Sequence, residues 1–470
     1  MKIKFGTSGW RAIISEDFTF DNVRLLSQAV SNYLKGAGLS KKGVLIGHDT
    51  RFLSSDFARE AARVLASNDI RVYLPKRSTP TPTVSYSVIN KKLGGAIMIS
   101  ASHNAPEYNG FKFSAETGGP SSEKVSRMIE KQAACVKIKD VKNDEKKAEK
   151  NIITFDPRPA YMRKLRKVLN MSMLKASRMK IAVDCMNGIA AGYLDRFIKD
   201  LNYEVKVINA HNDPLYGGRN PDPSPENLKE LINVVKKENF DIGLAVDGDS
   251  DRFGVIDGNG EFIIPNKIIS LIFYYLVNSA KLMPCVARSV STTHLIDEIA
   301  KDYGVNTVET PIGFKYIAEQ LLSGACMLGA EESGGLSVAG HVPEKDGLLA
   351  NLLVVEAMVY FKKPLRAILD EIYQKYGRFY NKRINIKVDW PSQRKFMAKL
   401  AQKPPLRIAK RKVVTINKVD GYKFILEDGD WLMFRPSGTE PMVRCYIESR
   451  SRKRYNNLLK EAGNLIETMR

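Results

Sequence analysis

The sequence predicts an α/β protein made of three successive mixed α/β units followed by an α+β segment. Short apolar runs alternate with helical patterns as far as a helix that starts near Asn351, whereas residues 384–470 show short strands and one closing helix. At 470 residues the chain is too long for a single core, and its 44% hydrophobic and 27% charged residues are typical of a globular protein.

The first unit shows the alternation of strands and helices most clearly. Residues 20–35 place apolar side chains on one helical face and stop near Gly36, which predicts an amphipathic helix. We expect strands at 44–46, 70–74 and 96–99, a helix at 56–67 and a stiff turn at 79–82. This spacing predicts a parallel sheet with helices on both faces.

A change of composition separates the first unit from the second. Residues 136–150 are rich in Lys, Asp, Glu and Asn, which predicts a solvated linker or helix end with a domain boundary shortly after it. In the second unit we expect a helix opening at Asn187–Gly188 and strands at 180–184, 203–208, 241–246, 254–256 and 261–264.

The third α/β unit is expected from Asn266 through the helix that starts near Asn351. Residues 377–387 predict a linker into the last segment. There we expect strands at 413–416, 431–434 and 443–448 and a helix from about residue 455.

Composition excludes some classes of protein and leaves others open. The chain has no apolar run long enough to span a bilayer and no signal-peptide pattern at its start, so we expect a cytoplasmic protein without membrane contact. Its five cysteines are scattered and form no CxxC pair, which predicts reduced thiols. The net charge of +21 suits either nucleic acid or small anionic substrates, and the lysines are spread along the whole chain.

A serine follows the buried strand predicted at 96–99. The stretch continues into Ser102, His103 and Asn104, and ligands bind at the carboxyl ends of strands in open α/β sheets. Ser102 is therefore either a turn residue or a nucleophile, and this stretch alone leaves both interpretations open.

Three aspartates follow the strand predicted at 241–246. Asp247, Asp249 and Asp251 alternate along the chain, so extended backbone would turn all three carboxylates to one side. Carboxylates this close repel one another and favour a hard cation such as Mg²⁺ or Ca²⁺. An EF-hand loop is excluded because its glycine and glutamate positions hold Arg252 and Gly258, while an acidic surface turn remains the alternative.

Two further stretches resemble ligand-binding loops. Near the C-terminus Arg435, Ser437, Gly438, Thr439 and Arg444 combine guanidinium groups, hydroxyls and an approachable backbone, which favours a phosphate site over a plain turn. Residues 330–335 offer Glu331 and Ser333 to sugar hydroxyls, but a helix N-cap explains them equally well. Arg11 and Lys112 are cations that could stabilise a phosphoryl group in transit.

Taken together, these stretches resemble the α-D-phosphohexomutase family. The motifs FGTSGWR, ISASHN, DGDSDR, EESGG and RPSGTEP occur in the family's order and cover essentially the whole chain. The resemblance implies four domains around a central cleft, which we place at residues 1–152, 153–258, 259–372 and 373–470. It also implies sugar-phosphate substrates, no nucleic-acid partner, and a monomer or homodimer.

The resemblance also implies roles for individual residues. Ser102 would carry the exchanged phosphoryl group, with Lys112, Arg11 and His103 around it. One Mg²⁺ would be held by Asp247, Asp249 and Asp251 together with a phosphoserine oxygen. The residues implied to bind substrate are Arg252, Arg288, Lys315, Glu331 and Ser333. Those implied to bind the phosphate that does not react are Arg435, Ser437, Gly438, Thr439 and Arg444.

The implied activity is the interconversion of hexose 1-phosphate and hexose 6-phosphate through a bound hexose 1,6-bisphosphate. The segments TPIGFK at 310–315, EKDG at 344–347 and EESGG at 331–335 resemble members that act on glucose. Members acting on both mannose and glucose, or on glucosamine, often have histidine where this chain has Gly335, and His341 lies further on. Ala12, Ala330 and Ala105 depart from the family pattern without removing a proposed functional side chain.

Two alternatives remain open at this point. One is a phosphomannomutase, or an enzyme acting on both mannose and glucose phosphates. The other is an inactive paralogue that binds phosphate or nucleic acid, suggested by the positive charge.

Overall fold

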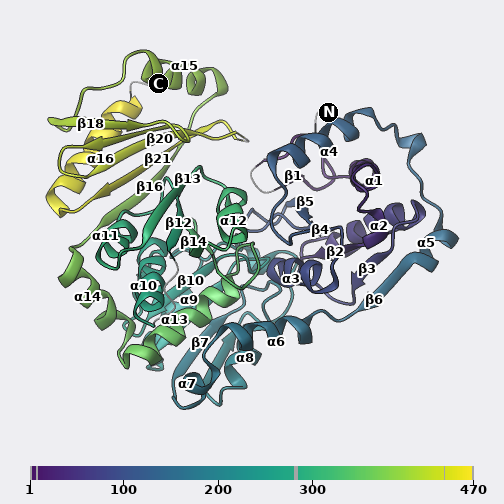
Figure 1. The fold of residues 1–470 in the computed structure, drawn as a ribbon, viewed down its shortest axis with the longest axis horizontal. Coiled ribbons are helices and arrows are strands. Elements are labelled where there is room, and N and C mark those ends of the chain that lie inside the picture. Colours follow the sequence, from purple (N-terminus) through teal and green to yellow (C-terminus); the bar gives the residue numbers. More distant parts are fainter. Residues whose placement is uncertain (1–2, 7–8, 280–283, 439, 468–470) are drawn as a thin grey trace.

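The computed structural model describes residues 3–6, 9–279, 284–438 and 440–467. Three α/β units follow one another along the chain, and a C-terminal α+β unit lies beside the third of them, as Figure 1 shows. The predicted fold class is confirmed. No helix in these ranges is both long and apolar enough to cross a membrane.

The first unit has a mixed six-stranded sheet of order β1-β5-β4-β2-β3-β6, not the expected purely parallel one. Strands β2, β3, β4 and β6 are parallel, β5 runs antiparallel to β4, and β1 pairs antiparallel with β5 and so has the direction of β4. The strands are β1 (Trp10–Ile13), β2 (Val44–His48), β3 (Val72–Pro75), β4 (Gly95–Ile99), β5 (Tyr108–Ala115) and β6 (Ile152–Phe155). The helices are α1 (Phe20–Gly36), α2 (Ser54–Ser67), α3 (Thr81–Lys91), α4 (Glu123–Cys135) and α5 (Glu145–Asn151).

The segment expected to be a solvated linker contains a helix. The Asp144 side chain caps α5 by accepting a hydrogen bond from Lys147 N–H, and Ala148 is buried in the core of the first unit. A single small apolar residue anchors this helix, so the hydrophobic pattern of the sequence is too weak to reveal it.

The second unit has a five-stranded sheet of order β11-β10-β9-β7-β8, and the third a four-stranded sheet of order β13-β12-β14-β15. The strands are β7 (Lys180–Asp184), β8 (Glu204–Ile208), β9 (Ile242–Val246), β10 (Phe253–Asp257), β11 (Phe262–Ile263), β12 (Cys285–Ser289), β13 (Asn306–Thr310), β14 (Cys326–Glu331) and β15 (Gly335–Val338). The helices are α6 (Arg158–Val168), α7 (Met171–Lys175), α8 (Leu194–Lys199), α9 (Lys229–Lys237), α10 (Pro265–Asn278), α11 (Leu295–Asp302), α12 (Phe314–Leu322), α13 (Gly347–Phe361) and α14 (Leu365–Tyr376). The helix expected to open at Asn187 begins at Leu194 instead.

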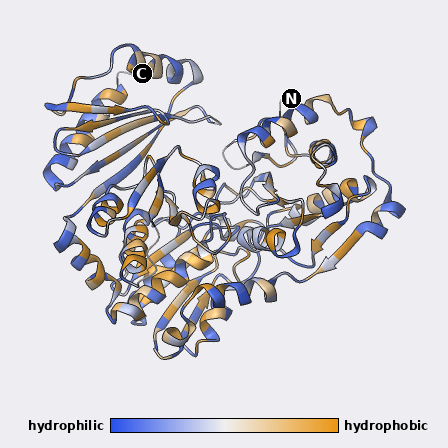
Figure 2. Cartoon of the chain, viewed as in Figure 1, coloured by the Kyte–Doolittle hydropathy of each residue, from blue (hydrophilic) through white to orange (hydrophobic). Residues whose placement is uncertain are grey.

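The second and third units share one hydrophobic core. Helix α13 is buried on all its faces because it packs against α10 of the third unit and against β9 and β10 of the second. Apolar residues dominate α13 and its neighbours in Figure 2. The first and fourth units have separate cores of their own.

The fourth unit is an antiparallel six-stranded sheet of order β16-β21-β20-β19-β18-β17. Its strands are β16 (Tyr380–Lys387), β17 (Arg407–Ile408), β18 (Arg411–Asn417), β19 (Tyr422–Leu426), β20 (Trp431–Pro436) and β21 (Met442–Ser449). Its helices are α15 (Trp390–Gln402) and α16 (Arg452–Glu467). The expected linker at 377–387 is therefore mostly strand β16, which pairs with β21 along its whole length.

A common arrangement relates the three α/β units. In each, a buried strand is parallel to one neighbour and is joined by a short loop to an antiparallel partner: β4 to β5, β9 to β10, and β14 to β15. These loops contain the serine, aspartate and sugar-loop motifs. The phosphate motif occupies the equivalent hairpin turn between β20 and β21 in the fourth unit.

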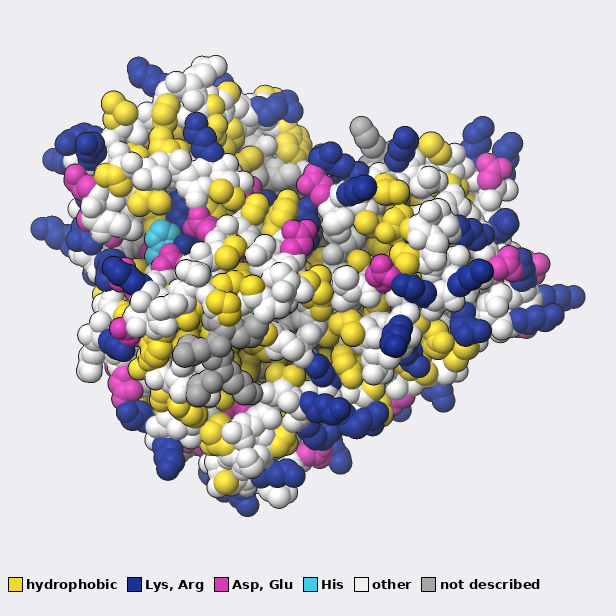
Figure 3. Space-filling model, in the orientation of Figure 1, with side chains coloured by type: hydrophobic (Ala, Val, Ile, Leu, Met, Phe, Trp, Pro, Cys, Tyr) yellow, Lys and Arg dark blue, Asp and Glu magenta, His cyan; other side chains and the backbone are white. Residues whose placement is uncertain are grey.

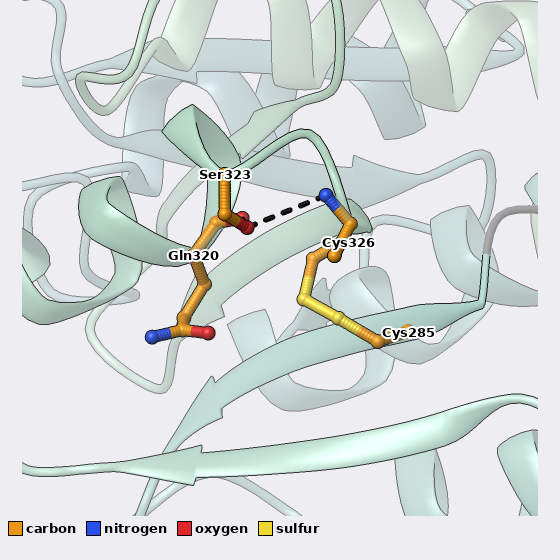
Figure 4. Close-up of a disulfide and its surroundings, with 5 residues drawn as sticks. Cys285, Gln320, Ser323 and Cys326 are labelled. Carbon is orange, nitrogen blue, oxygen red and sulfur yellow. Dashed lines mark hydrogen bonds between the residues drawn. A yellow bond between two sulfur atoms is a disulfide. The ribbon is translucent and has the colours of Figure 1, made fainter.

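One pair of cysteines is joined, contrary to the expectation that all thiols are reduced. Cys285 and Cys326 begin the parallel strands β12 and β14, stand opposite each other in register, and form a disulfide (Figure 4). Their Cα atoms are 4.3 Å apart although 41 residues separate them in sequence. The pairing of the two strands brings them together, which the scattered spacing of the cysteines could not indicate.

Candidate active site

The turn between β4 and β5 presents Ser102 to the second unit. The Ser102 backbone has a φ of 55°, a region that residues other than glycine rarely enter, and the side chain is buried. The Ser102 N–H donates to Ser100 Oγ at 2.9 Å, and Ser102 Oγ donates to Asp247 Oδ2 at 2.7 Å. The predicted serine loop and aspartate loop therefore meet, although their motifs lie far apart in the sequence.

Arg51, which is not among the residues predicted from the sequence, holds the serine turn in shape. Its guanidinium donates to four carbonyl oxygens of the turn and its exit: Ser102 (2.6 Å), Asn104 (2.7 Å), Ala105 (2.7 Å) and Tyr108 (3.0 Å). Asp49 Oδ2 accepts from Arg51 Nε at 3.1 Å and compensates its buried charge. The place of Arg51 in the sequence could have identified it. Arg51 follows β2, the parallel neighbour of β4, so the ends of both strands lie at one edge of the sheet.

Asp247, Asp249 and Asp251 form a compact carboxylate cluster in the loop between β9 and β10. One oxygen from each lies within 4.8 Å of the others, and all three side chains are buried. Asp249 Oδ1 and Asp251 Oδ1 have no hydrogen-bond partner among the described residues. Buried carboxylate oxygens without donors fit a hard cation such as Mg²⁺, so the residues present suit the predicted ion.

The three carboxylates differ strongly in their affinity for protons. Burial, followed by repulsion from Asp251 and Asp249, raises the pKa of Asp247 well above its ordinary value. Burial would also raise the pKa of Asp249, but the nearby ammonium groups of Lys112 and Lys345 lower it below the usual range. The repulsion within the cluster is reduced because one carboxyl holds a proton and because lysine ammonium groups lie beside the other two.

Two lysines approach the cluster from different units. Lys112 Nζ, on β5, lies 2.5 Å from Asp249 Oδ2 and 3.7 Å from Asp251 Oδ2. Lys345 pairs with Asp251 from the third unit, and Thr81 Oγ1 donates to Asp249 Oδ2 at 2.7 Å. Lys345 was absent from the predicted site, although it lies within the EKDG segment noted in the sequence.

His103 and Arg11 lie beside the serine. His103 Nδ1 is 3.3 Å from Ser102 Oγ, and Arg11 Nη1 donates to Asn104 Oδ1 at 2.6 Å. Burial, reinforced by Arg252 and Arg11, lowers the pKa of His103 well below its ordinary value. The His103 imidazole is therefore neutral near pH 7 and has a nitrogen free to accept a proton or hydrogen bond.

The sugar-loop motif lies at the junction of β14 and β15. Glu331 Oε1 accepts a hydrogen bond from Gly313 N–H at 2.8 Å, and burial raises the pKa of the Glu331 carboxyl. Ser333 lies in the turn between the two strands.

Arg252, another predicted substrate-binding residue, lies at the end of the aspartate loop. Its backbone N–H donates to Asp247 Oδ1 at 2.9 Å, and this hydrogen bond joins the end of the loop to its beginning.

Arg288 and Lys315 already have protein partners. Arg288 Nη1 lies 2.6 Å from Glu309 Oε2, and its other nitrogens bind Asp297, so its guanidinium is part of the internal structure of the third unit. Lys315 Nζ is 3.8 Å from Glu123 Oε2 of the first unit. Nothing in this geometry directs Arg288 toward Ser102, whereas Lys315 lies where the first and third units meet.

The phosphate loop is tied to the third unit. Arg435 Nε donates to Asp420 Oδ2 at 2.8 Å, and the same oxygen accepts from Ile312 N–H at 3.0 Å. Ser437 Oγ accepts from Glu440 N–H, and Gly438 has open space around it. Arg444 is paired with Glu440 at 3.4 Å, while Thr439 lies outside the described residues.

Comparison with known proteins matches all four units. The phosphoglucomutase/phosphomannomutase α/β/α domains I, II and III match residues 2–137, 159–260 and 264–376, and the C-terminal domain of that family matches residues 384–463. A phosphoglucomutase/phosphomannomutase from Thermococcus kodakarensis is 30% identical over 466 residues, covering 98% of both chains. The chain belongs to the phosphoglucomutase/phosphomannomutase family.

Other relatives in this family are named for different sugars. A phosphoglucosamine mutase from Methanocaldococcus jannaschii is 29% identical over 473 residues, covering 98% of both chains. A crystal structure from Thermus thermophilus, assigned as a phosphomannomutase, superposes with a TM-score of 0.87 at 31% identity and covers 99% of both chains. The family thus identifies a phosphohexomutase with an aspartate metal site, while its relatives differ in sugar.

Proposed function

We propose that this phosphohexomutase is a Mg²⁺-dependent phosphoglucomutase that interconverts glucose 1-phosphate and glucose 6-phosphate through a phosphoserine at Ser102. The observation that carries the proposal is the 2.7 Å contact between Ser102 Oγ and Asp247 Oδ2, which places the hydroxyl against the carboxylate cluster. A phosphoryl group on that oxygen would lie beside both the metal ligands and Lys112.

In the first step the phosphoryl group passes from Ser102 Oγ to the free hydroxyl of the sugar phosphate. The bond between phosphorus and Oγ breaks as the bond to the sugar oxygen forms, so the sugar hydroxyl loses a proton and the departing Oγ gains one. We assign proton exchange at Oγ to His103 Nδ1, which lies 3.3 Å from Oγ and is kept unprotonated by burial, ready to take the Oγ proton when Ser102 accepts a phosphoryl group again. The product is a bound hexose 1,6-bisphosphate.

The charge of the transferring group is neutralised by the chain's own cations and by the metal. Lys112, Arg11 and Lys345 surround the aspartates and serine from two units. When bound by Asp247, Asp249 and Asp251, Mg²⁺ supplies positive charge to the phosphoryl oxygens. Phosphoryl transfer needs mainly this positioning and neutralisation, because the protein contributes little covalent chemistry of its own.

The second half of the cycle requires the bisphosphate to turn over and return its other phosphate to Ser102. Glu331 and Ser333 would bind sugar hydroxyls in either orientation, together with Arg252 and Lys315. Arg435, Ser437, Gly438 and Thr439, with Arg444, would bind the phosphate that is not reacting. Arg288 is not included among the proposed substrate-binding residues, because its contacts with Asp297 and Glu309 give it a structural role.

Glucose is favoured over mannose and glucosamine by the sugar loop. His341, the histidine nearest to the EESGG motif in sequence, is buried with its Nε2 2.6 Å from Asp346 Oδ2. Tyr161 donates to the same carboxylate oxygen at 2.7 Å. His341 therefore does not replace the histidine that members acting on both mannose and glucose, or on glucosamine, often carry at the position of Gly335.

A substrate panel tests the proposal. Purified enzyme is assayed with the 1-phosphates of glucose, mannose and glucosamine, each with Mg²⁺ and a catalytic amount of glucose 1,6-bisphosphate. We expect the largest kcat/KM for glucose 1-phosphate and no turnover by Ser102→Ala. Retained turnover by that variant would refute the phosphoserine mechanism, and a preference for mannose 1-phosphate would refute the choice of sugar.

The second candidate is a phosphomannomutase, or an enzyme with both activities, favoured by the Thermus relative at 31% identity. An inactive nucleic-acid-binding paralogue has less support, because the lysines and arginines in Figure 3 are spread over the visible face. Salt-sensitive nucleic-acid binding without turnover would favour it. We further propose a cytoplasmic monomer or homodimer with domains at residues 1–152, 153–258, 259–372 and 373–470.

A further inference from the structure

A small cavity lies where the chain passes from the third unit into the fourth. Its walls come from the start of α10 and from α14 in the third unit, and from residues 378–381 and α16 in the fourth. Its volume is about 170 Å³. We call it the hinge cavity, because residues 378–381 connect the two units.

The charged side chains that line the hinge cavity are all cations: Lys267, Arg366, Arg378 and Arg452. Carboxylates outside the cavity pair with two of these cations. Arg366 pairs with Glu261 and Asp370, and Arg378 Nη2 lies 3.3 Å from Asp370 Oδ1. Asp257 also acts on Lys267 and Arg366, so the local group contains one more cation than carboxylates, and its potential attracts an anion.

One cation in the wall lacks a carboxylate partner. Within the described parts of the chain, the partly buried Lys267 has no carboxylate oxygen within 4.0 Å of its Nζ, which lies 5.9 Å from the centre of the Tyr373 ring. Burial lowers the pKa of Lys267, and Arg366 and Arg378 add to this while Glu261 and Asp257 oppose it. An anion in the cavity would offer acceptor oxygens to Lys267 Nζ.

The fourth unit contributes a guanidinium group that lies beside two aromatic rings. Arg452 lies 5.6 Å from the Tyr380 ring centre and 5.4 Å from the Tyr455 ring centre. Cation–π contacts of this kind favour the guanidinium at this place without neutralising its charge. The rings also give the cavity an apolar wall that suits an organic group.

We propose that the hinge cavity binds the phosphoryl group of inorganic phosphate or of a small phosphomonoester. Lys267, Arg378 and Arg452 supply cations to the oxygens, and Tyr380 and Tyr455 contact any organic part. A tetrahedral dianion matches cations placed on several sides better than a planar carboxylate does. The cavity is smaller than the roughly 300–1,000 Å³ typical of drug-sized ligands, which restricts the organic part to a few atoms.

Binding in the hinge cavity would affect both units that form it. A ligand held simultaneously by α10, α14 and α16 stabilises the relative orientation of the third and fourth units seen here. The stabilisation grows with ligand concentration as RT ln(1 + [L]/Kd). Phosphate would therefore change the movement of the phosphate loop in the fourth unit without occupying the active site.

Calorimetric titration with inorganic phosphate and with phenyl phosphate tests the proposal. Because the active site also binds phosphate, the test compares the double variant Lys267→Met/Arg452→Ala with Arg435→Ala, which alters the active-site loop. We expect two binding events in the unmodified enzyme. The hinge variant should lose one event, with at least tenfold weaker binding, and should keep its turnover measured without added phosphate. Arg435→Ala should retain the hinge event.

A further variant separates specific binding from general effects. Lys403→Met/Arg407→Ala removes the same charge from exposed positions of the fourth unit and should leave both events unchanged. Tighter binding of phenyl phosphate than of inorganic phosphate identifies a phosphomonoester as the ligand, and equal binding identifies phosphate itself. Unchanged stoichiometry and affinity in the hinge variant for both probes would overturn the proposal.

Discussion

At the scale of single residues, the backbone of Ser102 depends on Arg51. A left-handed conformation at a serine costs about 1–3 kcal/mol and persists only where its surroundings impose it. Four carbonyl oxygens on one guanidinium provide that constraint, and Asp49 keeps the guanidinium in place. The hydroxyl is thereby aimed at the aspartate loop before any substrate arrives.

Replacing Arg51 by Met should therefore damage both stability and activity. The change leaves buried carbonyl oxygens without donors and Asp49 without its partner, so we expect the free energy of unfolding to fall by about 3–5 kcal/mol. We also expect kcat to fall at least tenfold, because Ser102 is no longer held. Urea unfolding and mutase assays measure the two effects.

The matched control for Arg51 is Arg59→Met. Arg59 is exposed and pairs with Asp56 on the surface, so its removal should change the free energy of unfolding by less than about 1 kcal/mol. Equal effects of the two substitutions would show that the carbonyl contacts of Arg51 do not matter.

Site residues could be predicted from the sequence where all the groups that act together lie in one short stretch. The three aspartates could be recognised because their spacing alone brings carboxylates together. Arg51 and Lys345 could not be recognised, because each acts on a loop that lies far away in the sequence. Only the pairing of strands and the packing of units brings such residues to the site.

At the scale of elements, Asp420 connects the phosphate loop to the sugar loop. One of its oxygens accepts hydrogen bonds from both Arg435 Nε and Ile312 N–H, and the neighbouring Gly313 N–H is bound by Glu331. A short series of contacts thus joins the β20–β21 hairpin to the end of β14. Asp420 orients the guanidinium proposed to bind the distal phosphate.

A double-mutant cycle tests this role of Asp420. We expect Asp420→Asn to raise KM for glucose 1-phosphate about tenfold with little change in kcat, since about 1.4 kcal/mol of a charge-assisted contact is lost. Arg435→Ala should raise KM further, and the double variant should match Arg435→Ala alone. Asp428→Asn, in the same unit, should leave KM unchanged.

Additive effects of Asp420 and Arg435 would show that Asp420 does not act through the guanidinium. If Arg435→Ala itself left KM unchanged, the phosphate loop would be wrongly assigned, whatever the result for Asp420. The cycle therefore separates the positioning role of Asp420 from the proposed function.

The disulfide between β12 and β14 is a second feature at this scale. We expect protein prepared without reductant to contain three reactive thiols after unfolding, Cys135, Cys185 and Cys445, and five after reduction. Reduction should lower the free energy of unfolding by about 2–4 kcal/mol, because the bond closes a loop of moderate length. Mass spectrometry of unreduced peptides should find Cys285 linked to Cys326, and five reactive thiols without reduction would contradict the pairing.

Helices and strands could be predicted where their hydrophobic periodicity is strong. They could not be predicted where the periodicity is weak and pairing with a distant strand stabilises the element instead. Helix α1 and strands β4 and β9 carry clear apolar patterns and lie where the sequence places them. Strand β16 alternates exposed polar residues with few buried ones, and its pairing with β21 supplies the hydrogen bonds that make it a strand. Such pairing leaves little trace in a single sequence.

At the scale of the whole molecule, the fourth unit is docked through a buried ammonium group. Lys423 Nζ donates to Val290 O at 2.8 Å and lies 2.7 Å from His294 Nε2 and 3.1 Å from Glu309 Oε2. Its other neighbours are the Trp431 ring, at 4.4 Å, and the charged groups Arg288 and Glu448. The third and fourth units therefore meet through polar contacts as well as an apolar patch around Val290 and Trp431.

This docking predicts how stability depends on pH. Burial, with repulsion from Arg288, lowers the pKa of Lys423 to about 8 in spite of Glu309. The native amine loses its proton near pH 8, whereas the unfolded chain keeps it up to the ordinary lysine pKa of about 10.5. Between these values the unfolded state binds more protons, so the free energy of unfolding rises with pH.

Lys423→Met isolates this contribution because it keeps most of the side-chain volume and removes the ionisable group. We expect the unmodified protein to gain stability relative to the variant between pH 8 and pH 10, and the difference to be constant below pH 7. Denaturant unfolding of both proteins at several pH values measures it. A difference that stays constant across the whole range would mean that Lys423 keeps its proton in the folded protein and that the two units are held together by an ion pair with Glu309.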